Sequence, residues 1–250
     1  MQLRLIQDST AVATQVAERG ANVLRAALSC QGEATLVAAT GMSQLTMLGL
    51  LARSSGIDWS RVTVFHLDEY IGLPATHPAS FRRYLHERFL DLLPSQPAFV
   101  GVAGDAADLA AELTRLNQRL AGRRVDLCFA GIGDNAHLAF NDPPADFQVD
   151  APYIAVQLDS SCRQQQVDQG WFARLDDVPQ RAISMSVRQI LRSDCLLVIV
   201  TGRHKAQAVR GMVDGPIDPT CPASALQGHA NCSVHLDAAA ASGLRRVPAG

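Results

Sequence analysis

Residues 128 to 144 read Cys128-Phe-Ala-Gly-Ile-Gly-Asp-Asn-Ala-His-Leu-Ala-Phe-Asn-Asp-Pro-Pro144. The apolar beginning of this stretch predicts a buried strand, which two glycines break into a loop. The double proline at the end prevents a long helix from following. The loop is crowded with functional groups, because five polar side chains lie within nine positions: Asp134, Asn135, His137, Asn141 and Asp142. Since binding and catalytic groups concentrate on loops carried by a rigid scaffold, we expect a functional site here.

Further apolar runs of the same kind alternate with amphipathic stretches along the chain. Near-continuous Val, Ile and Leu runs are typical of strands that are covered on both faces. We predict strands at residues 35–39, 62–67, 125–130, 153–158, 182–187, 196–200 and 233–236, and helices at 9–28, 43–52, 80–93, 105–120, 203–213 and 223–227. Ser9 or Thr10, Ser80 and Asp105 are the expected N-caps. The alternation predicts α/β architecture, with a doubly wound, mainly parallel sheet and helices on both faces.

Length and composition limit the number of domains, the partners and the cellular location that the chain can have. The chain has 250 residues, 48% of them hydrophobic and 18% charged, with a net charge of -2. We expect one domain over residues 1–250, with a frayed tail after about residue 242. The absence of long charge runs argues against nucleic acid or an anionic membrane as a partner. The six cysteines form no C-x-x-C pair and are interpreted as core residues in a reducing compartment. With neither a signal peptide nor an apolar run of about 20 residues, a soluble cytoplasmic protein is expected.

Polar loops follow four of the predicted strands. They are Thr40-Gly-Met-Ser43, Asp68-Glu-Tyr70, the loop at 131–142 and Thr201-Gly-Arg-His-Lys205. In an open parallel sheet, ligands bind beyond the carboxyl ends of the strands. We therefore expect these four loops to converge on one site.

The turn at Thr40-Gly-Met-Ser43 has the character of a phosphate site. Gly41 permits a tight turn before a helix, and the exposed amides and dipole at a helix start favour an anion. Lys205, in a second turn after Gly202, could complement a dianion as a point charge. The alternatives are an ordinary helix cap by Ser43 and a solvated lysine.

Asp68 and His137 are the candidates for proton transfer. A carboxylate at the end of a strand can act as a base or cap a helix, and alternation along the strand lets only one of Asp68 and Glu69 face the site. His137 alone among the seven histidines lies in a glycine-marked loop at the end of a core strand. Imidazole exchanges protons near neutral pH, and Asp142 could fix its tautomer. A packed or surface histidine is the alternative.

Two other site types are disfavoured. Gly131-Ile-Gly-Asp-Asn-Ala136 matches the dinucleotide fingerprint, but Pro143 and Pro144 stop the long helix that a nucleotide-binding fold requires. The carboxylates and His137 show no recognised metal-ligand spacing, so no metal is expected.

The chain resembles the glucosamine-6-phosphate deaminase family in two long motifs and two short ones. The long motifs are Leu67-Asp-Glu-Tyr-Ile-Gly-Leu-Pro74 with His77-Pro-Ala-Ser80, and Gly131-Ile-Gly-Asp-Asn-Ala-His-Leu-Ala-Phe-Asn-Asp142. The turn at Thr40 and Gly202-Arg-His-Lys-Ala206 support them. The resemblance runs from the first predicted strand to the last. It implies a Rossmann-like fold and the conversion of an amino-sugar 6-phosphate to fructose 6-phosphate and ammonia, without a cofactor.

The resemblance also implies roles by position. His137 would open the pyranose ring, oriented by Asp142, and Asp68 would then move the C2 proton in an aldose–ketose isomerisation that releases the amine. The segment from Cys162 to Phe172 occupies the place of the family's mobile lid. The implied phosphate-binding residues are Thr40, Gly41, Met42, Ser43, Lys205 and, from the lid, Arg163.

Four positions depart from the family pattern. Asn135 stands where many members have Asp, Asp142 where most have Glu, Ala136 where glycine is usual, and Met42 where the residue is glycine or small. Asn135 removes a negative charge near His137, so imidazolium is less favoured than beside an Asp. An amide still orients its neighbours by hydrogen bonds, so Asn135 is kept among the catalytic candidates.

Two alternatives stay open on the sequence. One is a lactone hydrolase like the 6-phosphogluconolactonases, which resemble this family and would use the histidine to activate water. The other is a non-catalytic sugar-phosphate sensor. A small hexosamine phosphate is the expected ligand. A homo-oligomer is compatible with the sequence, which fixes neither the oligomeric state nor the sugar epimer.

Overall fold

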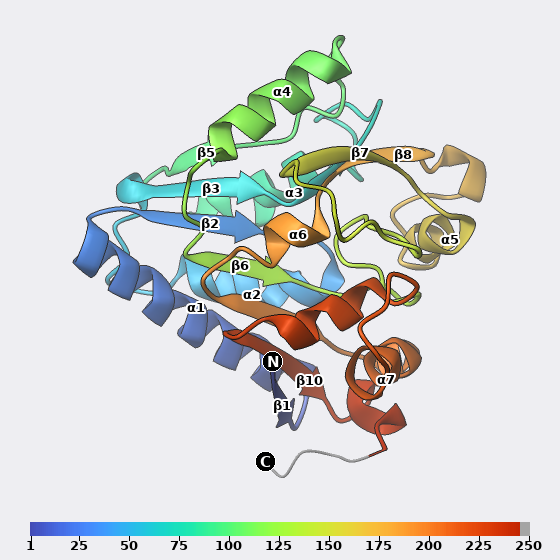
Figure 1. Ribbon diagram of the computed structural model, residues 1–250. Helices are drawn as coiled ribbons and strands as arrows, with labels where there is room; N and C mark the ends of the chain where they lie inside the picture. Colours follow the sequence, from blue (N-terminus) through green and yellow to red (C-terminus); the bar gives the residue numbers. More distant parts are fainter. Residues whose placement is uncertain (246–250) are drawn as a thin grey trace.

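The computed structural model describes residues 1–245 and is built around a parallel sheet (Figure 1). Every neighbouring pair in this sheet is parallel. The order of its seven strands is β1 (Gln2–Ile6), β10 (Cys232–Asp237), β9 (Leu196–Val200), β6 (Leu127–Ala130), β2 (Ala34–Ala38), β3 (Val62–His66) and β5 (Ala98–Val100). The predicted parallel α/β architecture is confirmed. β1 and β5 were not predicted, because one is half exposed and the other has three residues.

A small antiparallel sheet stands beside the main one. Its order is β4 (Asp68–Tyr70), β8 (Arg181–Met185) and β7 (Tyr153–Gln157). The predicted strands at 153–158 and 182–187 exist, but they belong to this sheet and not to the parallel one. The burial of β7 explains this difference, because most of its residues are partly exposed, whereas a strand of the parallel sheet is covered on both faces.

Helices cover the main sheet on both faces. In Figure 1, α2 lies behind the sheet and packs on α1, while α6 lies in front. The α-helices are α1 (Ser9–Gln31), α2 (Met42–Ala52), α3 (Phe81–Arg88), α4 (Leu109–Leu120), α5 (Ser160–Asp168), α6 (Val187–Ile190) and α7 (Ala206–Asp214). The 3-10 turns are η1 (Trp59–Arg61), η2 (Leu90–Leu92), η3 (Leu175–Asp177), η4 (Arg203–Lys205), η5 (Pro222–Gly228) and η6 (Ala240–Gly243).

The helix starts correct two of the predicted caps. Asp8, not Ser9 or Thr10, caps α1 by accepting from the Ala11 amide at 2.9 Å. Asp108, not Asp105, caps α4, because the residues before it form a loop. Ser80 caps α3 as predicted.

The helix ends and types also differ from the prediction. α3 ends at Arg88 and the chain continues as η2, while the helices expected at 203–213 and 223–227 are wholly or partly 3-10. α5 and α6 were not predicted, because α5 is a polar run without apolar periodicity and α6 has four residues. The fraying expected after residue 242 falls mainly on residues 246–250, which lie outside the described part.

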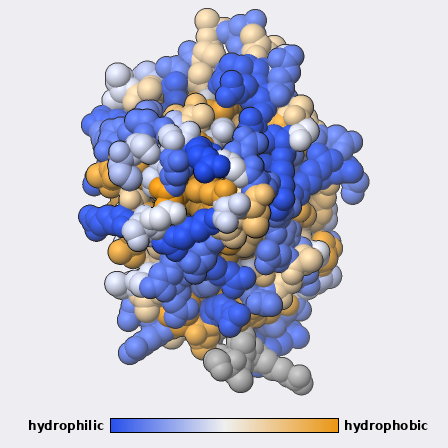
Figure 2. Space-filling view, turned by 90° about the vertical axis from the view of Figure 1, so that its left-hand side faces the viewer, coloured by the Kyte–Doolittle hydropathy of each residue, from blue (hydrophilic) through white to orange (hydrophobic). Residues whose placement is uncertain are grey.

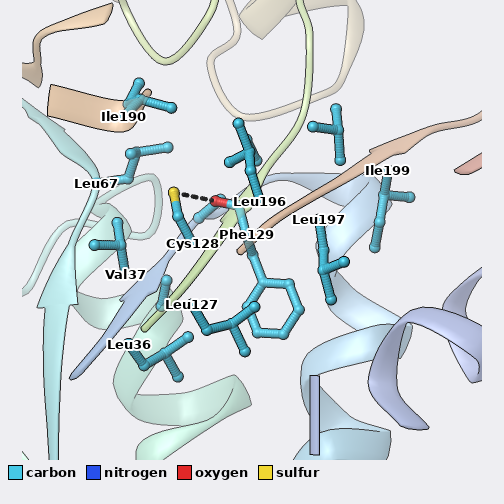
Figure 3. Close-up of a cluster of buried hydrophobic side chains, with 14 of the residues drawn as sticks. Leu36, Val37, Leu67, Leu127, Cys128, Phe129, Ile190, Leu196, Leu197 and Ile199 are labelled. Atoms are coloured by element: carbon cyan, nitrogen blue, oxygen red, sulfur yellow. Dashed lines mark hydrogen bonds between the residues drawn. The ribbon is translucent and has the colours of Figure 1, made fainter. Parts of the chain in front are cut away.

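Buried aliphatic side chains hold the sheet and helices together. In Figure 3, Leu127, Cys128 and Phe129 of β6 lie among side chains of the neighbouring strands. All six cysteines are free, and four of them are buried as predicted, but Cys30 is exposed and Cys221 is half-buried, so these two are not core residues. Among residues 1–245, no helix is long and apolar enough to cross a membrane.

In Figure 1 the arrows of β2, β3 and β6 in the main sheet point from the edge at the left toward the edge at the right, where β7, β8, α5 and α7 gather. Figure 2 shows the opposite face, at the amino ends of the strands, which is mostly hydrophilic with a narrow hydrophobic strip near its middle. The loops that carry the predicted chemistry therefore lie at the carboxyl edge.

Candidate active site

One cavity of about 290 Å³ lies at the carboxyl edge of the main sheet, and all four predicted loops contribute to it. Its wall combines the ends of β2, β6 and β9 with the lid segment around α5. The predicted site residues in the wall are Thr40, Gly41, Met42, Ser43, Asp68, His137 and Lys205. The loops therefore converge as the parallel topology predicts.

The turn before α2 presents a helix N-terminus to this cavity. Gly41 has φ 104°, a left-handed conformation that favours glycine, and it is the N-cap of the helix. Within the described residues, no side chain caps these amides. The hydroxyl of Tyr84 donates to the Gly41 carbonyl at 2.9 Å and fixes the turn. The first amides of α2 are thus free for an anion, and the Met42 side chain is 55% exposed, so it leaves them open.

Asp68 is a buried carboxyl that lines the cavity. It begins β4, where the chain passes from the main sheet to the small one. Its Oδ1 atom has no hydrogen-bond partner within residues 1–245. Burial, and secondarily the charge of Glu69, raises the pKa of Asp68 to about 8. An unpaired carboxyl with such a pKa is a stronger base than an exposed aspartate, and its ionised form can take a proton from a bound ligand.

Glu69 takes the helix-capping role that the sequence left open between the two neighbours. Its carboxylate accepts from the amides of Tyr70, Phe81 and Arg82 at 3.0, 3.1 and 2.8 Å, and from the Ser80 hydroxyl at 2.8 Å. Burial raises the pKa of Glu69, and these hydrogen bonds oppose that shift. Alternation along the strand thus turns Asp68 to the cavity and Glu69 to the start of α3.

We expect Glu69→Ala to lower the free energy of unfolding by about 3 kcal/mol, because it leaves several buried donors without an acceptor. Glu87→Ala is the matched control, because Glu87 is exposed and pairs with Arg83 on the same helix. Urea unfolding of both variants measures the difference. Equal stabilities would contradict the capping role.

The His137 ring is backed by a carboxylate. Its Nδ1 atom lies 3.1 Å from Asp142 Oδ1, and within residues 1–245 it forms no hydrogen bond. Burial raises the pKa of Asp142, but His137, the Asp159 amide and Asn135 outweigh it, so the pKa is lowered and the group is ionised. Gly133 permits the close approach of the ring, since a Cβ there would lie 2.2 Å from it.

Asn135 lies between two carboxylates. Its Nδ2 atom donates at 3.1 Å to both Asp142 and Asp159, and its Oδ1 accepts from the His137 amide at 3.0 Å. An aspartate at this position would put a third negative charge beside the other two. The departure to Asn135 is therefore matched to its surroundings, since the amide both donates and accepts.

The two predicted cations lie in different places. Lys205 follows Gly202 at the start of α7 and reaches the cavity, where burial lowers its pKa and Asp134 opposes the shift. Arg163 is turned to the backbone that follows the lid, where it donates to the carbonyls of Leu175 and Val178 at 2.6 and 3.2 Å. Its predicted contact with a phosphate stays a prediction and would require the lid to rearrange.

Sequence reasoning missed three glutamines and several hydroxyls of the cavity wall. Gln165 and Gln166 come from α5, Gln169 directly follows this helix, and Thr201 directly follows β9. The run Gln164-Gln-Gln166 was a visible signal, because uncharged amides on a lid suit a polyhydroxylated ligand. Ser9 and Thr10 were predicted as caps and instead contribute to the wall.

One cavity brings together a helix N-terminus, a buried lysine, an unpaired carboxyl and a histidine. These groups are suited to bind a small phosphorylated molecule and to move protons on it. The model of the glucosamine-6-phosphate isomerase and 6-phosphogluconolactonase family matches residues 7–234. The chain is 36% identical over 214 residues to a glucosamine-6-phosphate deaminase of Streptococcus equi subsp. zooepidemicus (strain MGCS10565), covering 86% of this chain and 89% of that one. For the deaminase of Streptococcus pneumoniae (strain 70585), identity is 37% over 217 residues, with the same coverage.

Solved structures agree with the family match. A monomeric glucosamine-6-phosphate deaminase superposes with a TM-score of 0.89 at 31% identity, over 97% of this chain and 100% of that one. A 6-phosphogluconolactonase from Shewanella baltica OS155 shares the fold with a TM-score of 0.80 at 22% identity, over 95% and 98%. The chain belongs to the glucosamine-6-phosphate isomerase and 6-phosphogluconolactonase family.

Proposed function

We propose that the protein is a glucosamine-6-phosphate deaminase, which converts glucosamine 6-phosphate and water to fructose 6-phosphate and ammonia. The observation that carries the proposal is the placement of Asp68 and His137 on one cavity whose far wall is a helix N-terminus with Lys205. The two streptococcal relatives reported above are at least 36% identical to this chain over most of its length, and both are deaminases by name. The matching 6-phosphogluconolactonases, which stand at 22% identity or less, support the fold alone.

The phosphate is held at the start of α2. The free amides of the helix, the hydroxyls of Thr40 and Ser43, and the ammonium of Lys205 complement its negative charge. A phosphate anchored at C6 places the sugar across the cavity, toward Asp68 and His137. Anchoring a remote group in this way orients the reacting carbons.

Ring opening is the task of His137. The imidazole takes the proton of the anomeric hydroxyl and returns a proton to the ring oxygen, so that the C1–O5 bond breaks and the aldehyde forms. Asp142 and Asn135 position the loop and the ring. Asp142, held ionised, stabilises the imidazolium while the ring nitrogen carries the extra proton.

Asp68 then carries out the isomerisation. Its carboxylate takes the proton from C2 of the aldehyde, and the resulting enolamine is protonated at C1. The product is an imine at C2, which water hydrolyses to the ketone, with ammonia leaving. The raised pKa makes Asp68 a stronger base than an exposed aspartate.

Product analysis tests the proposal. With glucosamine 6-phosphate we expect ammonia and fructose 6-phosphate in equal amounts, and no reaction with unphosphorylated glucosamine. Assays with mannosamine and galactosamine 6-phosphates establish the epimer. Hydrolysis of 6-phosphogluconolactone without ammonia from any hexosamine phosphate would replace the proposal by the lactonase alternative, and ligand binding without any turnover by the sensor.

The pH dependence follows from Asp68. Because its pKa is raised to about 8 in the free enzyme, the base form is depleted below that pH. We expect kcat/KM to fall about tenfold per pH unit below pH 8, since this parameter reports the free enzyme. The limb is measured from pH 6 to 9 with wild type and Asp68→Glu. A flat profile across this range, or an identical limb in Asp68→Asn, would contradict the assignment.

A further inference from the structure

The lysine assigned to the phosphate already has an anionic partner. Lys205 Nζ lies 2.5 Å from Asp134 Oδ1, with the lysine side chain 9% exposed and the aspartate side chain 43% exposed. Asp134 belongs to the loop that carries His137, three positions further on. Its carboxylate thus stands beside the ammonium that the proposed function gives to the substrate.

The ion pair with Asp134 offsets the cost of burying the Lys205 ammonium. A cation removed from water is costly unless an opposite charge accompanies it, and Asp134 supplies that charge to Lys205. A phosphate dianion at the same ammonium would lie beside the carboxylate, and two like charges at such a distance repel strongly. The two anions therefore compete for Lys205.

Asp134 also joins three segments that surround the ligand. Its amide donates to Gln165 Oε1 of α5 at 3.1 Å, and its carboxylate lies 3.9 Å from Nε2 of His204 in η4. Gln165 and His204 both line the cavity. Because the aspartate is partly exposed, its side chain has water on one side into which it can turn when Lys205 is taken by another anion.

We propose that Asp134 is a specificity-determining residue, whose carboxylate occupies Lys205 until a phosphate dianion displaces it. The inference rests on the phosphate site of the proposed function. A tethered carboxylate is present at high effective concentration, so a free monoanion competes poorly with it. A dianion, which also gains the amides of α2, can replace it. The pair thus selects phosphorylated sugars against carboxylated ones.

The test is calorimetric titration at pH 8 with inorganic phosphate and with acetate. In Asp134→Asn we expect phosphate to bind at least tenfold more tightly than in wild type, and acetate binding to become measurable. Asp168→Asn is the matched control, because Asp168 is exposed on α5 and contacts Gln164 instead of Lys205. Asp168→Asn removes the same charge from the same side of the molecule, and we expect it to change the phosphate affinity less than twofold.

Asp134→Glu keeps the charge and guards against a variant that fails to fold. We expect its phosphate affinity to stay within about threefold of wild type, while Lys205→Met abolishes phosphate binding in every background. Unchanged or weaker phosphate binding in Asp134→Asn, or an equal gain in Asp134→Glu, would overturn the inference. The titration involves no turnover, so a failure to release ammonia would sink the proposed function and leave this result standing.

Discussion

Asp68→Asn is expected to lower kcat for ammonia release by about 10² to 10⁴-fold, the usual contribution of a positioned base. The amide has the shape of the carboxyl but cannot take the C2 proton. Asp68 is buried with Oδ1 unpaired in the described chain, so the substitution leaves no charged partner behind. We therefore expect the variant to fold and to bind inorganic phosphate within about threefold of wild type.

Steady-state ammonia release and phosphate titration measure the two quantities. Asp150→Asn serves as the control, because Asp150 is exposed and pairs with Arg188 and Arg192 away from the cavity. Turnover in Asp68→Asn within threefold of wild type would reject Asp68 as the base. A parallel loss of phosphate binding would show a disturbed cavity instead of a lost proton acceptor.

His137→Gln is expected to show the second large effect, and one that depends on the form of the substrate. We expect kcat with cyclic glucosamine 6-phosphate to fall by about 10² to 10⁴-fold, because ring opening loses its acid and base. An analogue without the hydroxyls at C4 and C5 cannot close a sugar ring and needs no opening. With this analogue we expect less than a tenfold loss.

The comparison of the two substrates distinguishes ring opening from other tasks of the histidine. Asp142→Asn, which keeps the shape beside the ring but removes the charge, should give the same pattern with a smaller loss, since Asp142 acts through His137. Equal losses on the cyclic and the open-chain substrate would mean that His137 acts after ring opening, or that it only supports the loop.

The sequence predicted the convergence of the site better than its individual contacts. Parallel topology follows from strands that are apolar on both faces, and it brings Thr40, Asp68, His137 and Lys205 to one cavity. The separate roles of Asp68 and Glu69 could not be predicted from the sequence. Alternation along the strand implies that the two side chains point to opposite faces, but it does not say which of them faces the cavity. Only the structure shows that Glu69 caps α3.

Other features lay beyond sequence reasoning for physical reasons. α5 has no apolar periodicity, so the cavity glutamines in it and at its end carried no helical signal. The pairing of Lys205 with Asp134 joins residues 71 positions apart, since 205 less 134 is 71, and only packing brings such groups together. Arg163, assigned to the phosphate by its position in the lid, donates instead to the backbone at Leu175.

A crystal structure with 2-amino-2-deoxyglucitol 6-phosphate tests the central claim most directly. This open-chain analogue has no carbonyl and cannot turn over. We predict that its phosphate lies on the first amides of α2 and on Lys205, and that Asp134 no longer pairs with Lys205. We also predict that the Asp68 carboxyl lies within proton-transfer distance of C2, and that His137 lies beside C1 and the C5 hydroxyl. A ligand whose C1 and C2 lie away from both Asp68 and His137, with the lid closed over it, would contradict the account.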